Sequence, residues 1–395
     1  MSLKAIKIRL YPAVKQQRLL NQHFGCCRFI YNSALNYKKT LYSDYKINVS
    51  KYDILKQITD VKKEEDFHWL NDVKAECLQN SIDNLEVAYK SFFKGNGFPK
   101  FKNKKAKQSF VQKQNFKVLE NSNKLVFLKR KIKFKCSKQN QIELRISKIK
   151  RITYSKDNLN QYFASVLIEF IPKLLEINTN EVGIDLGLKH FLITSDGEFI
   201  ENPKFFRKSE KKLQKQQRKL SKKQKGSNNK NKQRIKVGKI HKKISNQRNH
   251  FLHQISNKII NENQVISLET LMVKNMIKNH KLAKSIQDAS WSTFVNMLEY
   301  KSGWYGREIK RISTFAPSSK TCSNCGWYNP NLTLNDRIFI CKECDYEEDR
   351  DINASKNILK FSNNREELPQ INASGDQPLG NLRKKKINDN VIECY

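Results

Sequence analysis

The sequence contains no long apolar run. No segment approaches the roughly 18 uncharged apolar residues that a membrane span requires, and the start, MSLKAIKIRLYP, lacks the apolar core of a signal peptide. We therefore expect a soluble protein that stays inside the cell and has no membrane partner. At 395 residues, the chain is long enough for two or three domains with cores of their own.

Acidic residues are also scarce: 38 Asp and Glu stand against 76 Lys and Arg, which leaves a formal net charge of +38. A compact chain with this surplus repels itself unless a polyanion neutralises it, and nucleic acid is the obvious polyanion. Codon bias can also enrich lysine, but it would spread the basic residues evenly. Instead, 18 Lys or Arg and a single acid, Glu210, fall between Arg207 and Arg248. Helix-spaced apolar residues in this stretch predict two basic helices, joined at residues 226–229, that bind nucleic acid.

Cysteine is present, but its pattern does not indicate disulfides. Nine cysteines, an odd number, do not read as a disulfide framework in a reducing compartment. Two residues separate Cys322 from Cys325 and Cys341 from Cys344, and fifteen lie between the pairs, which is the spacing of a zinc module. Four thiolates fill a tetrahedral shell, so we expect one structural Zn²⁺ without a catalytic role. The other five cysteines lack such spacing and are interpreted as core or incidental thiols: Cys26, Cys27, Cys77, Cys136 and Cys394.

The first half of the chain carries both strand and helix patterns. Residues 6–10 alternate apolar and basic side chains, which predicts a half-buried strand with a basic exposed face. Apolar residues three or four apart in 20–35 and 78–92 predict packed helices. Strand-like runs follow at 126–134, 142–146 and 163–170. This order predicts one small β domain, formed by the first strand and the later ones, with the helices inserted between them.

Residues 94–105, KGNGFPKFKNKK, interrupt the helical pattern with glycines and a proline. Phe98 and Phe101 alternate with Lys100 and Lys102, and such interleaving suits base stacking combined with phosphate contact on single-stranded nucleic acid. A solvated loop anchored by two rings fits the sequence nearly as well. Both interpretations therefore stay open.

A buried acid is the first sign of chemistry in the second half of the chain. Residues 181–187 form an apolar strand that contains Asp185, and residues 190–194 and 198–200 complete a three-stranded antiparallel meander. Burying a carboxylate costs several kcal/mol unless a cation or a hydrogen bond compensates it. Asp185 therefore requires a partner.

Two further acidic positions follow. The apolar strand 265–269 ends in Glu269, and a helix that runs to about Lys360 begins near Asp349 and Asp351. These two aspartates are about 200° apart around the helix axis, so both cannot face one site. Asp351 shares the inward-facing stripe with apolar or small residues at spacings of three, four and seven. We therefore favour Asp351 as the site residue and Asp349 as the helix cap.

Three carboxylates on two strands and a helix supply what a two-metal phosphodiesterase needs. Asp185, Glu269 and Asp351 offer hard oxygen ligands for two Mg²⁺ ions, one that activates water and one that stabilises the leaving oxygen. Taken singly, each acid has an ordinary explanation as a cap or a surface residue. Together, in this order of strands and helix, they fit an RNase H-like core.

These blocks together resemble the TnpB family, the transposon-encoded small nucleases akin to type V CRISPR effectors. The resemblance covers about residues 1–361, and the combination of blocks is specific. In the N-terminal half, the blocks that carry the resemblance are RLYPAVKQQRLLNQHFGCCRFIYN and FPKFK. In the C-terminal half, they are GIDLG at 183–187, SLETLMVKNM around Glu269, WSTFVNMLEYKSGWYG at 291–306, RISTFAPSSKTCSNC at 311–325, and DRDINASKNI after the second cysteine pair.

The resemblance implies an RNA-guided DNA endonuclease with a multidomain α+β fold. The expected domains are a small, wedge-like β-barrel (1–12 and 108–180), an inserted helical recognition domain (13–107), an RNase H-like RuvC nuclease domain (181–314 and 346–361) and an inserted zinc ribbon (315–345). The polar composition of residues 362–395 predicts a disordered tail.

The resemblance also implies catalytic residues, cofactors and partners. The matched catalytic positions are Asp185, Glu269 and Asp351, which would bind two Mg²⁺ ions. The partners would be a guide RNA derived from the transposon end and a target double-stranded DNA with a short adjacent motif. We expect a monomer with RNA, in the cytoplasm and associated with the nucleoid of a prokaryote, although the oligomeric state stays open.

Two positions depart from the family pattern. Ser267 interrupts what is more often an aliphatic run, and Thr270 stands where an acid is common, but neither change removes a metal ligand. A non-cleaving guide-dependent regulator is the main alternative, and such a protein should have lost at least one of the three acids. An accessory transposase on the same core also stays open, because sequence alone does not separate hydrolysis from strand transfer.

Overall fold

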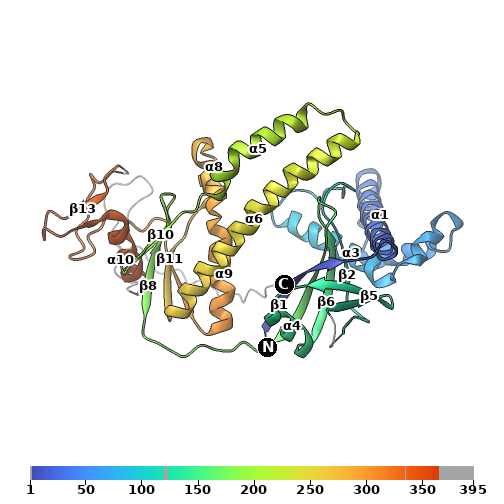
Figure 1. Cartoon of the computed structure of the whole chain (residues 1–395), viewed down its shortest axis with the longest axis horizontal. Coiled ribbons are helices and arrows are strands. Elements are labelled where there is room, and N and C mark those ends of the chain that lie inside the picture. Colours follow the sequence, from blue (N-terminus) through green and yellow to red (C-terminus); the bar gives the residue numbers. More distant parts are fainter. Residues whose placement is uncertain (1, 120–122, 334, 364–395) are drawn as a thin grey trace. The chain divides into compact units, whose positions relative to one another are not determined.

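The computed structural model describes residues 2–119, 123–333 and 335–363 (Figure 1). The chain divides into two compact units, one formed by residues 1–172 and 216–240 and the other by residues 173–215 and 241–395. Within the described residues, no helix is long and apolar enough to cross a membrane. The tail that we expected to be disordered lies, from residue 364 on, outside the described part of the chain.

The first unit contains a seven-stranded antiparallel sheet with the order β2-β6-β7-β1-β5-β4-β3. Its strands are β1 (Ser2–Tyr11), β2 (Gln108–Gln112), β3 (Lys117–Val118), β4 (Lys124–Phe127), β5 (Arg130–Lys135), β6 (Ile149–Lys156) and β7 (Tyr162–Phe170). Strand β1 buries Ile6, Ile8 and Leu10 and leaves Lys7 exposed, which confirms the predicted strand with a basic face. The order of the described strands is linear, so the β-barrel stays a prediction.

Four helical segments lie between β1 and β2, as the sequence predicts. They are α1 (Val14–Tyr45), α2 (Lys51–Val61), the 3₁₀ helix η1 (Glu65–Asp72) and α3 (Ala75–Phe93). The apolar stripes of α1 and α3 enter one core together with the sheet. Cys27 on α1 donates to the carbonyl of Cys77 on α3 at 3.3 Å, and burial raises the pKa of the Cys27 thiol to about 12. Such a thiol is inert, as expected for a core cysteine.

Residues 142–146 form a helix, and the predicted strand is wrong. Helix α4 (Lys138–Ile146) begins after Ser137, whose side chain accepts from the N–H of Asn140. Only Leu144 is buried, whereas Ile142 and Ile146 are exposed. Apolar residues two apart are typical of a strand. Here the capping serine and the polar residues before Ile142 favour a helix instead.

The second unit contains a five-stranded sheet with the order β10-β9-β8-β11-β12. Its strands are β8 (Glu181–Asp185), β9 (His190–Thr194), β10 (Phe199–Glu201), β11 (Val265–Glu269) and β12 (Glu308–Ile312). Strands β8, β9 and β10 pair antiparallel, which confirms the predicted meander. Strand β11 runs parallel to both β8 and β12, so the carboxyl ends of β8 and β11 meet at one edge of the sheet.

Helices and a small ribbon complete the chain. The helices are α5 (Phe205–Ser221), α6 (Asn228–Glu262), α7 (Val273–Met276), α8 (His280–Ala289), α9 (Trp291–Tyr305) and α10 (Arg350–Asn363). The two predicted basic helices are confirmed as α5 and α6, with the expected break between them. The ribbon consists of β13 (Ile338–Ile340) paired with β14 (Glu347–Asp349), together with a bridge between Thr321 and Tyr328.

Helix α10 packs directly on β8, and the contact depends on Gly183. A Cβ at this position would lie 2.0 Å from the carbonyl oxygen of Ser355 and 2.9 Å from the Cβ of Leu359. No side chain fits in that space. The glycine therefore allows the backbone of the helix to approach the backbone of the strand.

We predict that Gly183→Ala destabilises the protein. The added methyl group must displace backbone, and overpacking of this kind typically costs about 1 to 3 kcal/mol. The matched control is Gly25→Ala in the middle of α1, where nothing lies within 4 Å of an added Cβ and alanine should stabilise the helix by about 1 kcal/mol. Thermal unfolding measures both. Equal Tm values for the two variants would contradict the packing argument.

Candidate active site and metal centre

Asp185 and Glu269 are the last residues of β8 and β11. These strands are adjacent and parallel, and Ile184 lies opposite Leu268. The next residue on each strand is the acid, so Asp185 and Glu269 lie side by side at the ends of their strands. Their carboxyl groups are close enough for each to shift the pKa of the other. In α/β proteins, ligands bind beyond the carboxyl ends of the parallel strands, which is where these two acids lie.

The electrostatics of this edge favour a cation. Burial raises the pKa of the Asp185 carboxyl well above its ordinary value, and the negative charges of Glu269 and Asp351 raise it further, while Arg350 opposes the shift. Burial also raises the pKa of Glu269, against a smaller opposite effect of its hydrogen bond with Asp185. A cluster of carboxyl groups in this state binds a proton tightly. It would exchange that proton for a metal ion, because a metal stabilises the charged forms.

Asp349 caps helix α10, as the sequence suggested, and Asp351 lies beside Asp185. The Oδ1 of Asp349 accepts from the N–H groups of Asp351 at 2.8 Å and Ile352 at 3.3 Å, which confirms the helix cap. Asp351 lies near enough to Asp185 to raise its pKa. Its Oδ1 also accepts from Nε and Nη2 of Arg350, at 3.2 and 2.9 Å. The structure therefore brings Asp185, Glu269 and Asp351 together.

The three carboxylates are more widely spread than a closed metal site. Among the described residues, only the cysteine group has all its ligand atoms within 4.8 Å of one another. A cavity of about 140 Å³ lies beside Glu269 and is also lined by Trp291, Asn296 and Arg311. These residues and Arg350 fall within blocks that carry the family resemblance, but the sequence pattern assigned no role to them. Their relevance comes from tertiary proximity alone.

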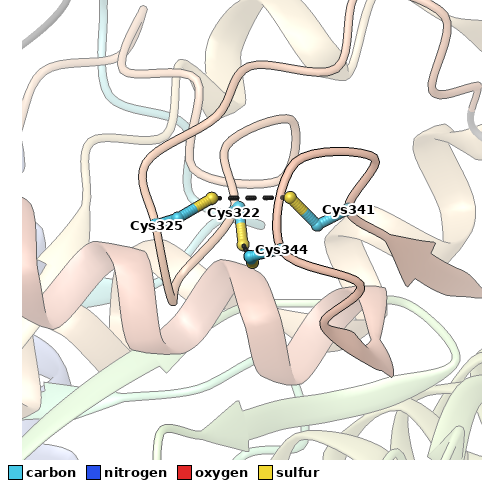
Figure 2. A group of neighbouring side chains, drawn as sticks. All are labelled: Cys322, Cys325, Cys341 and Cys344. Carbon is cyan, nitrogen blue, oxygen red and sulfur yellow. Dashed lines mark hydrogen bonds between the residues drawn. The ribbon is translucent and has the colours of Figure 1, made fainter.

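The four predicted zinc ligands form one cluster (Figure 2). The Sγ atoms of Cys322 and Cys344 are 3.8 Å apart, and those of Cys325 and Cys341 are 3.5 Å apart. Tetrahedral thiolates around zinc, at a Zn–S distance of about 2.3 Å, lie about 3.8 Å from one another. The cluster therefore has the size and the donor chemistry of a structural zinc site.

Asn324 directs hydrogen-bond donors at two of the four sulfur atoms. The N–H of Asn324 points at Cys322 Sγ at 3.4 Å, and the Asn324 amide donates to Cys344 Sγ at 3.5 Å. This hydrogen bond is the largest contribution that lowers the pKa of Cys344 to about 7. Left-handed backbone after each second cysteine, at Gly326 (φ 83°) and Asp345 (φ 52°), turns the chain tightly. Each cysteine pair thus lies on a tight turn, or knuckle.

Two further segments have properties of nucleic-acid contacts. All but three of the 18 Lys and Arg residues from 207 to 248 are exposed, and the single acid, Glu210, already pairs with Arg207 at 3.8 Å and Lys284 at 3.1 Å. In residues 94–105, Phe98 packs edge-on against Tyr89 and Phe92. Phe98 is thus an anchoring ring, while Phe101 is 53% exposed and free to stack.

Comparison with known families assigns most of the chain. Residues 166–280 match the OrfB_IS605 family, described as "Probable transposase". Residues 291–358 match "Cas12f1-like, TNB domain", and residues 1–46 match "Helix-turn-helix domain". In this structure, residues 1–46 contain strand β1 and a single continuous helix, α1.

Curated relatives are similar over almost the whole chain. The "Putative RNA-guided DNA endonuclease" of Streptomyces pristinaespiralis is 35% identical over 364 residues, covering 90% of this chain and 88% of the relative. "Putative RNA-guided DNA endonuclease InsQ" of Escherichia coli (strain K12) is 29% identical, covering 90% and 92%. "TnpB-like protein L770" of Acanthamoeba polyphaga mimivirus is 25% identical, covering 90% and 72%.

Two solved structures share the fold. The "Cryo-EM structure of the Cas12f1-sgRNA-target DNA complex" matches with a TM-score of 0.50 and 14% identity over 91% of this chain and 98% of the other. The "Structure of the mini-RNA-guided endonuclease CRISPR-Cas_phi3" matches with a TM-score of 0.50 and 9% identity over 91% and 92%. At these identities, the likeness is one of fold.

We predict that Asp185→Asn stabilises the metal-free protein at neutral pH. Because the raised pKa means that the folded state binds a proton more tightly than the unfolded state, the unaltered protein loses stability as pH rises from the ordinary carboxyl pKa of about 4 towards the raised value. Asparagine removes that loss. Tm measured in a chelator should therefore be similar for both proteins near pH 4 and higher for the variant near pH 8. Identical Tm values at both pH values would contradict the buried cluster.

We also predict one zinc ion per chain and its loss in Cys322→Ser. A structural zinc site supplies folding free energy to its own module, so the variant should lose zinc and become sensitive to protease within residues 315–345. Cys136→Ser is the control, because this half-buried thiol belongs to the first unit and to no metal cluster. Zinc is measured by elemental analysis. A content far below one per chain in the unaltered protein would refute the site.

Proposed function

Because the chain belongs to the TnpB family, we propose that it is a transposon-associated, RNA-guided DNA endonuclease that hydrolyses its target at a two-metal site. The observation that carries this proposal is the convergence of Asp185, Glu269 and Asp351 from two strands and a helix far apart in sequence. Two relatives that are similar over 90% of the chain have the corresponding name.

The residues of the site fit divalent metal ions. All three side chains offer carboxylate oxygens, which are the ligands that Mg²⁺ prefers. Burial raises the pKa of Asp185 and of Glu269, and the negative charges of Glu269 and Asp351 raise the pKa of Asp185 further. Asp185, Glu269 and Asp351 would hold two Mg²⁺ ions, which supply an activated water and stabilise the leaving oxygen. Arg350 neutralises part of the charge of Asp351 in their absence.

The sheet of the second unit supports an RNase H-like, RuvC-type nuclease domain. Its order, β10-β9-β8-β11-β12, combines an antiparallel meander with two parallel strands, and α10 packs on β8. We propose domain boundaries close to those that the sequence predicts: a β domain at 1–12 and 108–180, a helical recognition domain at 13–107, a nuclease domain at 181–314 and 350–361, and a zinc ribbon at 315–349. The ribbon extends past the predicted end at residue 345 because β14 pairs with β13.

The proposed partners are a guide RNA from the transposon end and a target DNA with a short adjacent motif. The structurally similar Cas12f1, solved as a complex with sgRNA and target DNA, supports this assignment. The exposed basic faces of α5 and α6 supply the positive charge that binding of phosphates requires. A discrete RNA that copurifies with the protein would support guided binding. Absence of RNA, with DNA binding intact, would favour a plain DNA-binding protein.

We predict that Asp351→Asn reduces Mg²⁺-dependent target cleavage by orders of magnitude with little change in Tm. The substitution keeps the shape of the side chain but removes the charge that a hard cation needs. Asp349→Asn is the matched control, because asparagine caps a helix about as well as aspartate and only an interaction with the helix dipole of about 0.3 to 1 kcal/mol is lost. Cleavage is measured with the guide RNA bound. An inactive Asp349 variant beside an active Asp351 variant would identify Asp349 as the third ligand.

A further inference from the structure

Helix α10 contains two buried asparagines that the proposed chemistry does not use. Asn353 and Asn357 lie one helical turn apart, and their exposed fractions are 0% and 1%. Both amide groups bond the backbone of residues 318–323, the segment that contains the first cysteine of the zinc site. We call this segment the first knuckle segment.

Asn353 holds the chain on both sides of Cys322. Its Nδ2 donates to the carbonyl of Thr321 at 2.8 Å, and its Oδ1 accepts from the N–H of Ser323 at 2.8 Å. One side chain therefore fixes the backbone before and after a zinc ligand. The same side chain lies two residues after Asp351, in the first turn of α10.

The next turns of the helix extend this contact. The Nδ2 of Asn357 donates to the carbonyls of Ser318 at 2.8 Å and Thr321 at 2.6 Å. Lys360 donates from Nζ to the carbonyl of Ser323. Side chains from three successive turns of one helix thus bind a single short segment of the ribbon.

Hydrogen bonds of buried amides specify position more strictly than apolar contacts do. Leaving a buried donor or acceptor unpaired costs about 1 to 3 kcal/mol, so a displaced knuckle would lose several such bonds together. An apolar side chain at the same place would tolerate small shifts. The asparagines therefore define one relative placement of α10 and the first knuckle segment.

Other residues of α10 contact the sheet. The Ser362 hydroxyl bonds the hydroxyl of Ser267 on β11 at 2.6 Å, and both residues are buried. The backbone at Ser355 lies against Gly183 of β8. The helix that carries Asp351 is thus fixed by the sheet at some positions and by the zinc ribbon at others.

We propose that Asn353 is a positioning residue that transmits the geometry of the zinc-bound first knuckle segment to the Asp351 carboxylate, with Asn357 supporting the same contact from the next turn. This inference rests on the proposed function, in which Asp351 binds Mg²⁺. Zinc then determines the geometry of a site whose chemistry it does not enter. Because binding at coupled sites is reciprocal, disturbing the knuckle weakens Mg²⁺ binding, and occupation of the Mg²⁺ site strengthens zinc binding.

The first measurement is target cleavage by the full chain with its guide RNA over a range of Mg²⁺ concentrations. In Asn353→Ala, we expect the half-saturating Mg²⁺ concentration to rise, because Asp351 is no longer held in place. Cleavage at low Mg²⁺ should fall on the order of 100-fold, the loss that a misplacement of about 1 Å produces. High Mg²⁺ should restore much of the rate. A merely structural defect would lower the active fraction equally at every Mg²⁺ concentration.

The second measurement uses Co²⁺ in place of zinc and needs neither DNA nor cleavage. Thiolate-bound Co²⁺ has a visible spectrum, and its decay in a chelator reports loss of metal from the four cysteines. Asn353→Ala should lose the metal faster than the unaltered protein. Asn263→Ala is the matched control, because this asparagine is also buried, at 7% exposed, but it directly follows α6 and its amide donates to the carbonyl of Ile259 in the last turn of that helix.

A double variant separates coupling from two independent defects. If Asn353 acts through the zinc-bound knuckle, Asn353→Ala combined with Cys325→Ser should need no more Mg²⁺ than Cys325→Ser alone. Additive effects on the Mg²⁺ requirement would overturn the proposal. Should Asn353→Ala fail to fold, as judged by thermal unfolding, Asn357→Ala keeps both bonds of Asn353 and should show the same changes to a smaller extent.

The remaining outcomes distinguish the two proposals. An unchanged Mg²⁺ requirement in a cleaving Asn353→Ala protein would refute the positioning role and leave the endonuclease intact. Absence of cleavage by the unaltered, RNA-bound protein would refute the proposed function. In that case, unchanged Co²⁺ loss in Asn353→Ala would refute the knuckle contact as well.

Discussion

The close approach of α10 to β8 is the contact on which the candidate site depends. Because Gly183 has no side chain, the helix backbone at Ser355 comes within reach of the strand that ends in Asp185. Asp351 is one turn earlier on the same helix, so the approach brings its carboxylate towards the two acids at the sheet edge. Parallel pairing of β8 and β11 fixes the other two. A wider spacing between helix and strand would leave three unrelated carboxylates.

Bringing these charges together conflicts with the electrostatics of an unliganded protein. Burial raises the pKa of both Asp185 and Glu269, and the negative charges of Glu269 and Asp351 raise the pKa of Asp185 further, while Arg350 offsets only part of that shift. The chain as a whole carries the opposite sign, +38, with exposed lysines and arginines along α5 and α6. A small anionic site in a strongly basic protein suits a substrate that is itself a polyanion. In the proposed function, the basic faces would bind its phosphates, and metal ions at the anionic site would approach one of them.

The features that could be predicted from the sequence are those that a local pattern of residues encodes. Alternation and helical spacing predicted the meander, β11, and the helices α5 and α6, and the cysteine spacing predicted the cluster that forms. Helical periodicity also predicted correctly that Asp349 caps helix α10. The same reasoning failed at residues 142–146, where apolar residues two apart occur in a helix. It also could not find Arg350, Asn353 or Asn357, because their contacts join segments that only the tertiary structure brings together.

The position of the ribbon in the chain explains why such contacts are needed. Between the end of β12 at Ile312 and the start of α10 at Arg350, 37 residues intervene (313 to 349). A flexible connection of that length would leave the first turn of the helix, and with it Asp351, poorly placed, since long loops restrict their ends only weakly. Zinc held by the four cysteines would cross-link this excursion at four points, and β14 leads directly into α10. The asparagine bonds then tie the cross-linked segment to the helix itself, so that a long insertion ends at a defined position beside the two strand acids.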